Sequence, residues 1–133
     1  MMPDHVAARC ALVLETNNLR GGADAEAAAS TSLQRLVALL AKQQLPLTAL
    51  AQVVITHDGL SAASCEAVTA LAGRPIDFVR IDAATGYYDA KNVGFSATDA
   101  ARCDHVVFAD ADCLPGDDWL LQVLTPFTRG ADA

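Results

Sequence analysis

Two aspartates, Asp110 and Asp112, are the residues of this sequence best placed to do chemistry, because they directly follow an apolar run and only one alanine separates them. If their carboxylates lie about 6 Å apart, their repulsion at an effective dielectric constant of 20 is about 3 kcal/mol, which something must offset. A hard divalent cation would do so and would leave coordination positions open for phosphate. The structural alternative is that one aspartate caps the next helix and the other is solvated.

Polar side chains also end the other apolar segments of the chain. They are Glu15, Thr16 and Asn18 in the first segment, His57 and Asp58 in the second, and Asp82 in the third. Lys91 lies near the start of a predicted helix, where a cation and backbone amides favour anions. Structural alternatives remain for five of these residues, namely helix capping for Asp58, packing or capping for His57, loop solvation for Glu15 and Thr16, and surface exposure for Lys91.

The elements that must position these residues alternate between strand and helix. Short apolar runs that end in polar or glycine-rich turns predict strands, and apolar residues at helical spacing predict helices. The expected strands are Cys10–Thr16, Ala51–Gly59, Pro75–Asp82 and His105–Asp110. The expected helices are Ala25 to about Gln43, Ser61–Ala72, Lys91 to about Arg102, and Pro115 to about Phe127.

This alternation predicts an α/β fold in which helices flank a four-stranded, mainly parallel sheet on both faces. Residues 1–133 are expected to form a single domain. Ligands of such sheets bind outside the carboxyl ends of the strands, where the polar residues named above should converge. Gly94 lies inside the third helical pattern at a cost of about 1 kcal/mol relative to alanine, which indicates close packing against a strand or a ligand.

Composition and charge exclude several classes of protein. The formal net charge of -7 disfavours a nucleic-acid-binding protein. The four cysteines form no CxxC pair and no zinc-ligand spacing, so we expect reduced, buried thiols. The sequence shows neither a secretory signal pattern nor an apolar run of transmembrane length, so we expect a cytoplasmic protein. Peripheral attachment to the inner face of the membrane through another part stays open.

Missing motifs narrow the choice of enzyme class. The chain lacks GxGxxG after the first strand, GxxxxGK[ST] and GxSxG, which excludes dinucleotide oxidoreductases, P-loop enzymes and serine hydrolases. DADCLPGDD is not an EF-hand calcium loop, because Leu114 stands where a ligand is needed and Pro115 precedes the glycine. A phosphatase of the haloacid dehalogenase type fits poorly, because its DxD follows the first strand instead of the fourth.

Four segments, in order, resemble the nucleotide-binding half of family 2 glycosyltransferases, which have the GT-A fold. LVLETNN is similar to the family's first strand and Pro-Thr-Tyr-Asn turn, where Thr16 and Asn18 match and Glu15 replaces proline. VVITHDG is similar to the Val-Val-Asp-Asp-Gly segment, where Asp58 matches the second aspartate and His57 departs from the first.

The other two segments lie later in the chain. AKNVGFSAT resembles the Ala-Arg-Asn-x-Gly helix, with Lys91 in place of arginine. FADADCLPGDDWL resembles the DxD segment and the Pro and Trp-Leu that follow it. The resemblance covers the chain from about Cys10 to Phe127, and four ordered segments are far more specific than a DxD motif alone.

The resemblance implies a Rossmann-like GT-A half that binds a nucleotide-diphosphate sugar, such as a UDP- or GDP-sugar, with Mn²⁺ or Mg²⁺. It implies that Asp110 and Asp112 hold the metal. The residues implied to contact the nucleotide sugar are Glu15, Thr16, Asn18, Asp58, Lys91 and Asp110.

The reaction that the resemblance implies is sugar transfer to an acceptor with inversion. The family's catalytic base normally follows the DxD helix, and we assign no residue to that role. The sequence ends at TRGADA before such a segment. We therefore expect a truncated domain that binds a donor weakly without turnover.

A second hypothesis comes from another functional class. The chain could be a non-catalytic α/β nucleotide-binding or interaction domain that self-associates or docks on a partner, with the aspartates acting only as caps. One version is a homodimer formed through the surface where an absent half would pack. Exposed apolar side chains beside the fourth strand would favour this version.

Overall fold

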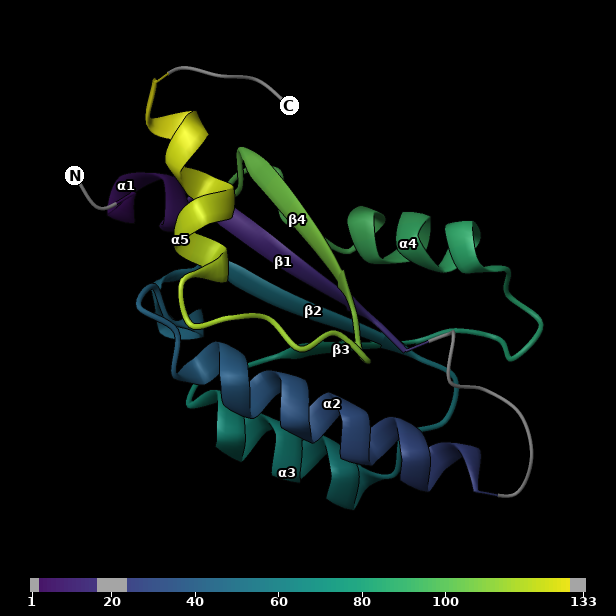
Figure 1. The fold of residues 1–133 in the computed structure, drawn as a ribbon. Helices are drawn as coiled ribbons and strands as arrows, with labels where there is room; N and C mark the ends of the chain where they lie inside the picture. The colour runs from purple at the N-terminus through teal and green to yellow at the C-terminus, as the bar shows by residue number, and fades with distance from the viewer. Residues whose placement is uncertain (1–2, 17–23, 130–133) are drawn as a thin grey trace.

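A parallel β-sheet with helices on both faces organises residues 3–16 and 24–129, which the computed structural model describes (Figure 1). The strands have the order β3-β2-β1-β4, and all three neighbouring pairs are parallel. This arrangement confirms the predicted α/β fold. In chain order the elements are α1 (Asp4–Ala7), β1 (Cys10–Glu15), α2 (Ala25–Ala41), η2 (Leu47–Ala49), β2 (Gln52–His57), α3 (Ala62–Ala72), β3 (Asp77–Arg80), α4 (Tyr87–Ser96), β4 (His105–Asp110), α5 (Trp119–Leu124) and η3 (Thr125–Arg129).

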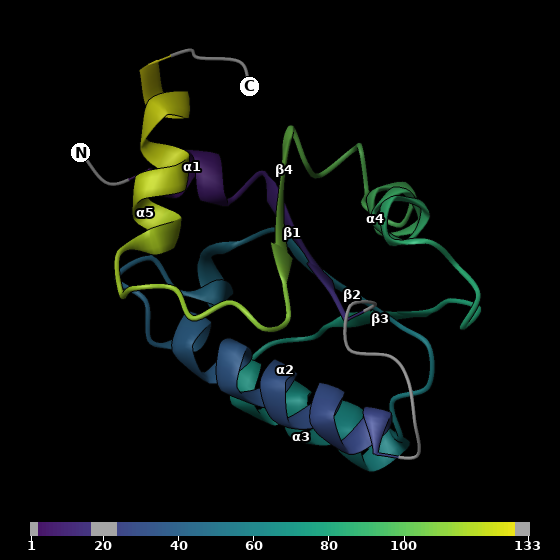
Figure 2. The same cartoon turned by 45° about the vertical axis from the view of Figure 1, so that its right-hand side comes forward.

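The helices cover the two faces of the sheet unequally. Helices α2 and α3 lie side by side against one face, and α4 lies alone on the opposite face, over β1 and β2 (Figures 1 and 2). The chain steps outward from β1 to β2 to β3, and then returns through α4 to place β4 beside β1. The strand order therefore reverses between β1 and β4, which is where open α/β sheets bind their ligands.

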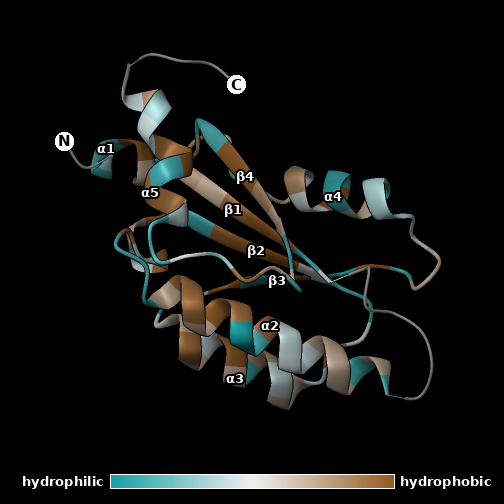
Figure 3. Cartoon of the chain, viewed as in Figure 1, coloured by the Kyte–Doolittle hydropathy of each residue, from teal (hydrophilic) through white to brown (hydrophobic). Residues whose placement is uncertain are grey.

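The sequence of the central strands follows from their burial on both faces. All six residues of β1 and all six of β2 are buried, so both segments are rich in aliphatic residues (Figure 3). Leu12, Leu14 and Ile55 point into the core shared with α2, α3 and α5. Strand β3 lies at the edge of the sheet and is partly exposed, which agrees with its more polar sequence.

Helix α4 begins earlier and ends earlier than the sequence predicts. It begins at Tyr87, four residues before Lys91, and it ends at Ser96, well before Arg102. The hydroxyl of Thr98 donates to the carbonyl of Phe95, and the carboxylate of Asp99 accepts from the amide of Ala101. Such short side chains compete for backbone groups and end the helix.

Helix α5 begins at Trp119 and not at Pro115, and after Leu124 the chain continues as a 3₁₀ helix. The amide group of Gln43, which follows α2, holds this start. Its Oε1 accepts from the amide of Leu120 at 3.1 Å, and its Nε2 donates to the carbonyl of Gly116. A contact across 77 residues cannot be recognised from local sequence.

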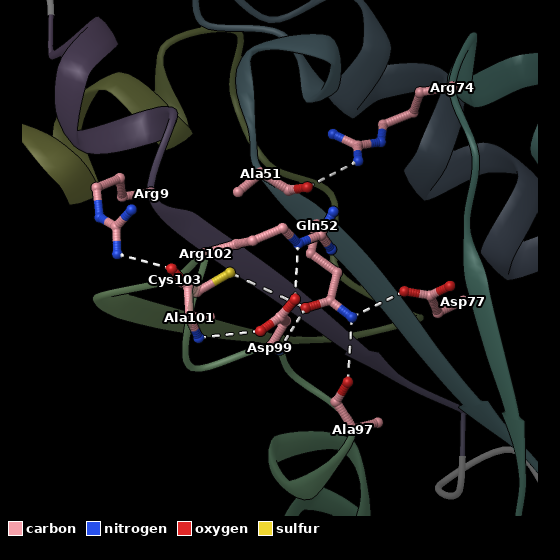
Figure 4. A network of polar contacts seen from close by, with 10 residues as sticks. All are labelled: Arg9, Ala51, Gln52, Arg74, Asp77, Ala97, Asp99, Ala101, Arg102 and Cys103. Carbon is pink, nitrogen blue, oxygen red and sulfur yellow. Dashed lines mark hydrogen bonds and ion pairs between the residues drawn. The ribbon is translucent and has the colours of Figure 1, made fainter.

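At the amino ends of the strands, the side chain of one residue hydrogen-bonds to several elements (Figure 4). Gln52, at the start of β2, donates from Nε2 to the carboxylate of Asp77 at 2.8 Å and to the carbonyl of Ala97 at 3.1 Å. Its Oε1 accepts from the amide of Asp99 at 2.8 Å. These hydrogen bonds link β2, β3 and the segment after α4. The amino ends of the strands therefore contribute to the stability of the fold.

All four cysteines are free, but the prediction that they are buried is wrong for most of them. Cys10 is buried within β1, and burial raises the pKa of its thiol to about 12. Cys65 and Cys103 are half-buried, and Cys113 is exposed, because it lies in the turn after β4 and not within a core element.

Across the two described ranges, no helix combines the length and the apolar character that crossing a bilayer requires.

Gly94 is the point of closest approach between α4 and the sheet. A Cβ built on Gly94 would lie 2.5 Å from Cγ1 of Val13 and 3.3 Å from Cγ2 of Thr56. Glycine therefore lets the helix backbone lie directly on β1 and β2, as the glycine in the helical pattern predicts.

We predict that Gly94→Ala destabilises the protein despite the better helix propensity of alanine. Overpacking costs about 1–3 kcal/mol, whereas the gain in propensity is at most about 1 kcal/mol. Chemical denaturation should show a lower midpoint, while Gly59→Ala, with nothing within 4 Å of its added Cβ, should change stability by less than about 0.5 kcal/mol. Equal stability of the two variants would contradict the packing argument.

Candidate functional site

The register of the sheet brings polar residues of three strands together at the carboxyl ends of the strands, which we call the carboxyl edge. Glu15, the last residue of β1, pairs with Thr56 of β2 on one side and with Asp110 of β4 on the other. Neighbouring strands lie about 4.8 Å apart, so these three positions share a short stretch of the carboxyl edge. Asp82, which follows β3, is exposed, and its carboxylate accepts from the amide of Ala84. Its hydrogen bond therefore lies within the turn after β3 and does not join it to the other polar residues.

Glu15 and Thr16 are buried, so the alternative of loop solvation is wrong for both. Glu15 is fully buried and accepts a long hydrogen bond, 3.5 Å, from the hydroxyl of Thr56. The hydroxyl of Thr16 donates to the backbone carbonyl of Thr56 at 2.8 Å. These bonds join the ends of β1 and β2. Asn18, the third residue predicted here, lies outside the described residues.

A cavity of about 240 Å³ opens between the ends of β1 and β2 and the start of α2. Thr16, Glu26, His57 and Asp58 supply its polar side chains. Asp58 does not cap α3, because Ser61 is the N-cap and its hydroxyl accepts from the amide of Ser64. The capping alternative for Asp58 is therefore wrong.

His57 packs, as one of its structural alternatives states, and holds the turn before α3, while it also lines the cavity. Its Nδ1 accepts from the amide of Leu60 at 3.0 Å, and its ring meets the ring of Phe78 edge-on. Burial lowers the pKa of His57, the charge of Arg80 lowers it further, and Asp58 opposes this shift. The imidazole is therefore neutral at pH 7.

At the β4 end of the carboxyl edge, two side chains of α4 contact the carboxylate of Asp110. The hydroxyl of Tyr87 lies 2.9 Å from both carboxylate oxygens, and Nζ of Lys91 lies 3.4 Å from Oδ1. Lys91 also lies over the rings of Tyr87 and Phe108 and is only 22% exposed in its side chain. Lys91 is therefore a partner of Asp110, and the alternative of a simple surface lysine is wrong.

Tyr87 also belongs to this site, although its sequence position did not indicate it. It precedes Lys91 by four residues, so the two share a helix face, but the predicted helix began too late to show this. Burial acts to lower the pKa of Lys91, but Tyr87 and Asp110 outweigh it, and the pKa is raised. Lys91 is therefore a fixed positive charge at this edge.

Asp112 is exposed just beyond Asp110. The amide of Ala111 donates to the carbonyl of Glu15, and the amide of Cys113 donates to the carbonyl of Asp110, so the chain turns directly after β4. Asp118 is the N-cap of α5. Neither Asp110 nor Asp112 is that cap, and the capping alternative is wrong.

A metal ion at the two aspartates would need most of its ligands from outside the described residues. Among the described residues, no three or more His, Cys, Asp or Glu side chains gather in a way that could hold a metal ion. Mg²⁺ and ions like it are commonly held by one or two carboxylates together with water and substrate phosphates. Asp110 and Asp112 could supply those carboxylates, and a diphosphate would supply the remaining oxygens.

We predict that the phenol of Tyr87 titrates above its ordinary pKa of about 10. The hydrogen bond to Asp110 is the main cause, because ionising the phenol breaks it, while Lys91 acts in the opposite direction. In a Tyr88→Phe background Tyr87 is the remaining tyrosine, so absorbance titration of phenolate reports it alone. Asp110→Asn in that background should lower the pKa, and an unchanged value would contradict the assigned pairing.

A scan against protein-family models matches residues 27–133 to "Glycosyl transferase family 2". No curated protein and no solved structure shows significant similarity to the chain. The match takes in the second, third and fourth strands and the whole segment from α4 to the two aspartates. It covers well over half of the chain and is consistent with the observed α/β fold and its parallel sheet. The chain therefore belongs to glycosyl transferase family 2.

Proposed function

We propose that this chain holds the nucleotide-diphosphate sugar donor of an inverting, metal-dependent glycosyltransferase at the carboxyl edge of its sheet. The observation that carries the proposal is the register that sets Glu15 between Thr56 and Asp110. It supports a single site because the end of β1 lies between the cavity beside β2 and Asp110 at the end of β4. Membership of family 2 supports a nucleotide-sugar donor for that site.

The cavity beside β2 is the proposed position of the nucleoside. Thr16 and Asp58 line it, and among the residues that the structure describes its polar side chains are acceptors or neutral groups, with no lysine or arginine. A diphosphate would be repelled by Asp58 and Glu26, whereas an uncharged base can hydrogen-bond to such groups. The base is therefore assigned to the cavity, with the ribose toward Asp110.

The diphosphate is assigned to the end of the site that carries Lys91. Asp110 and Asp112 would hold the divalent ion, Mn²⁺ or Mg²⁺, and the chemistry supplied by such an ion is neutralisation of the departing diphosphate. Lys91 already holds its charge beside Asp110, so it needs only a small movement to meet a phosphate oxygen. As a compact point charge, it would attract the phosphates without the bidentate geometry of arginine.

We predict that UDP or GDP stabilises the protein more strongly with Mn²⁺ than without it. Ligand at one hundred times its Kd should add about 2.7 kcal/mol to the free energy of unfolding. Asp112→Asn should remove the metal-dependent part, because it removes one of two carboxylate ligands. Thermal shift and calorimetry measure both effects.

Asp117→Asn is the matched control, because Asp117 is also exposed and lies only five residues away. It should leave the metal-dependent stabilisation unchanged. Metal-independent binding by the wild-type protein, or equal loss in both variants, would contradict the assignment of the metal to Asp112.

A second proposed function, self-association, is favoured by apolar exposure beside β4. Phe108 is 39% exposed and Leu114 is 63% exposed, and both line a cavity of about 330 Å³ that is largely apolar. Among the described strands, β4 pairs only with β1, so its other edge is open. An open strand edge beside exposed apolar side chains is typical of an association surface.

We predict that Leu114→Glu raises the dissociation constant of any dimer formed at this edge by about tenfold or more, because a charge would enter an apolar contact. Sedimentation over a range of concentrations measures it. Tyr88→Glu is the control, because Tyr88 is 77% exposed on α4 and lies away from that cavity. A wild-type chain that stays monomeric at high concentration would contradict this second function.

A further inference from the structure

The carboxylate of Asp110 is held by two groups that differ in charge. The hydroxyl of Tyr87 lies 2.9 Å from Oδ1 and 2.9 Å from Oδ2, whereas Nζ of Lys91 lies 3.4 Å from Oδ1. An ionised carboxylate only accepts hydrogen bonds, so the neutral phenol is the donor. Tyr87 is therefore the closer of the two contacts, and it is the one that carries no charge.

A neutral donor suits a carboxylate that must also bind a metal ion. A cation beside the carboxylate repels a divalent ion, whereas a phenol fixes the carboxylate without adding a net charge. The proposed diphosphate would also draw Lys91 away from Asp110 towards a phosphate oxygen. Tyr87 is then the contact of Asp110 that persists when the donor is bound.

The hydrogen bonds of Asp110 leave room for a metal ion on Oδ2. A carboxylate has about four acceptor positions, two on each oxygen. Tyr87 uses one position on each oxygen and Lys91 uses the second on Oδ1, so contacts with the described residues leave the second position on Oδ2 open. The side chain of Asp110 is 31% exposed, and Asp112 is exposed two residues further on. An ion shared by the two carboxylates is therefore compatible with the hydroxyl of Tyr87 in place.

The ring of Tyr87 is itself fixed by its neighbours. Nζ of Lys91 lies 4.8 Å from the centroid of this ring, and the ring of Tyr88 meets it edge-on with a centroid distance of 5.3 Å. Tyr87 is also the first residue of α4, and the close contact at Gly94 sets that helix on the sheet. A carboxylate held by a fixed ring has less rotamer freedom to lose when it binds a metal ion.

We propose that Tyr87 is a positioning residue that holds Asp110 in the orientation in which it shares a divalent metal ion with Asp112. The proposal rests on the proposed function, because it concerns the metal ion of the same site. It assigns a task to a residue that lies outside the four segments on which the family resemblance rests. Hydrogen-bond partners of metal ligands commonly contribute about 10–100-fold to metal affinity.

The test measures how much Mn²⁺ improves nucleotide binding by the chain. Calorimetry in Mn²⁺ and nuclear magnetic resonance titration in EDTA give two Kd values for UDP and two for GDP, and their ratio is the gain from the metal. For the nucleotide that the wild type binds, Tyr87→Phe should lower this ratio about tenfold or more, because only the hydroxyl is removed. Its Kd in EDTA should stay within about twofold of the wild-type value, since the assigned nucleotide contacts remain.

Tyr88→Phe is the matched control. It removes the same hydroxyl from the adjacent residue, whose side chain is 77% exposed, and it keeps the ring that contacts Tyr87. This variant should leave the ratio of the two Kd values unchanged.

A double-mutant cycle shows whether Tyr87 acts through Asp110. Asp110→Asn alone should lower the ratio, because it removes a charged ligand. Adding Tyr87→Phe to that variant should lower the ratio by less than about twofold further, since the hydroxyl no longer has a carboxylate to position. A tyrosine that only supports the fold would lower it equally in both backgrounds, and that result would overturn the proposal.

The remaining outcomes separate this proposal from the function on which it rests. If Mn²⁺ improves binding equally in the wild type and in Tyr87→Phe, the positioning role is overturned and the metal-dependent donor site stands. A higher ratio in Tyr87→Phe would also overturn the role, because the hydroxyl would then compete with the metal ion. If Mn²⁺ gives the wild type no gain, the proposed function fails, and this proposal fails with it.

Discussion

The whole arrangement depends on the burial and pairing of one strand, β1. Its six residues are all buried, and it pairs with β2 on one side and β4 on the other. Because successive residues of a strand point to opposite faces, a slip of one position would send Leu12 and Leu14 out of the main core. The same slip would move Glu15 away from Thr56 and Asp110. Core packing and site geometry are therefore fixed by one register.

A close contact on the other face gives the site its positive charge. Without a side chain at Gly94, α4 lies directly on Val13 and Thr56, and this depth carries Tyr87 and Lys91 to Asp110. Tyr87 and Lys91 contact the carboxylate of Asp110 and offset its repulsion by the other acidic side chains of the carboxyl edge. The close packing at Gly94 in α4 thus positions the charge of Lys91 and the hydroxyl of Tyr87, which lie one and two helical turns away.

The carboxyl edge consequently has two chemically different ends. Beside β2 the cavity offers Asp58 and a neutral imidazole, while beside β4 the site offers Lys91 and two aspartates. A donor with an uncharged base and a charged diphosphate has the same division along its length. Of the three departures from the family pattern, His57 and Lys91 lie at opposite ends of this edge, and Glu15 lies between them.

The sequence by itself determined the parallel sheet, because alternating apolar runs and amphipathic segments leave few other folds. It also placed Asp58, Asp110 and Asp112 at the ends of strands, since strand ends are marked by local polarity. The start of α5 required the tertiary structure, because Gln43 holds it from 77 residues away. The hydrogen bonds of Asp110 and His57 depend on contacts with Tyr87 and Leu60. Hydrophobic periodicity is a local property of the chain, whereas hydrogen-bond partners are decided only when distant segments pack.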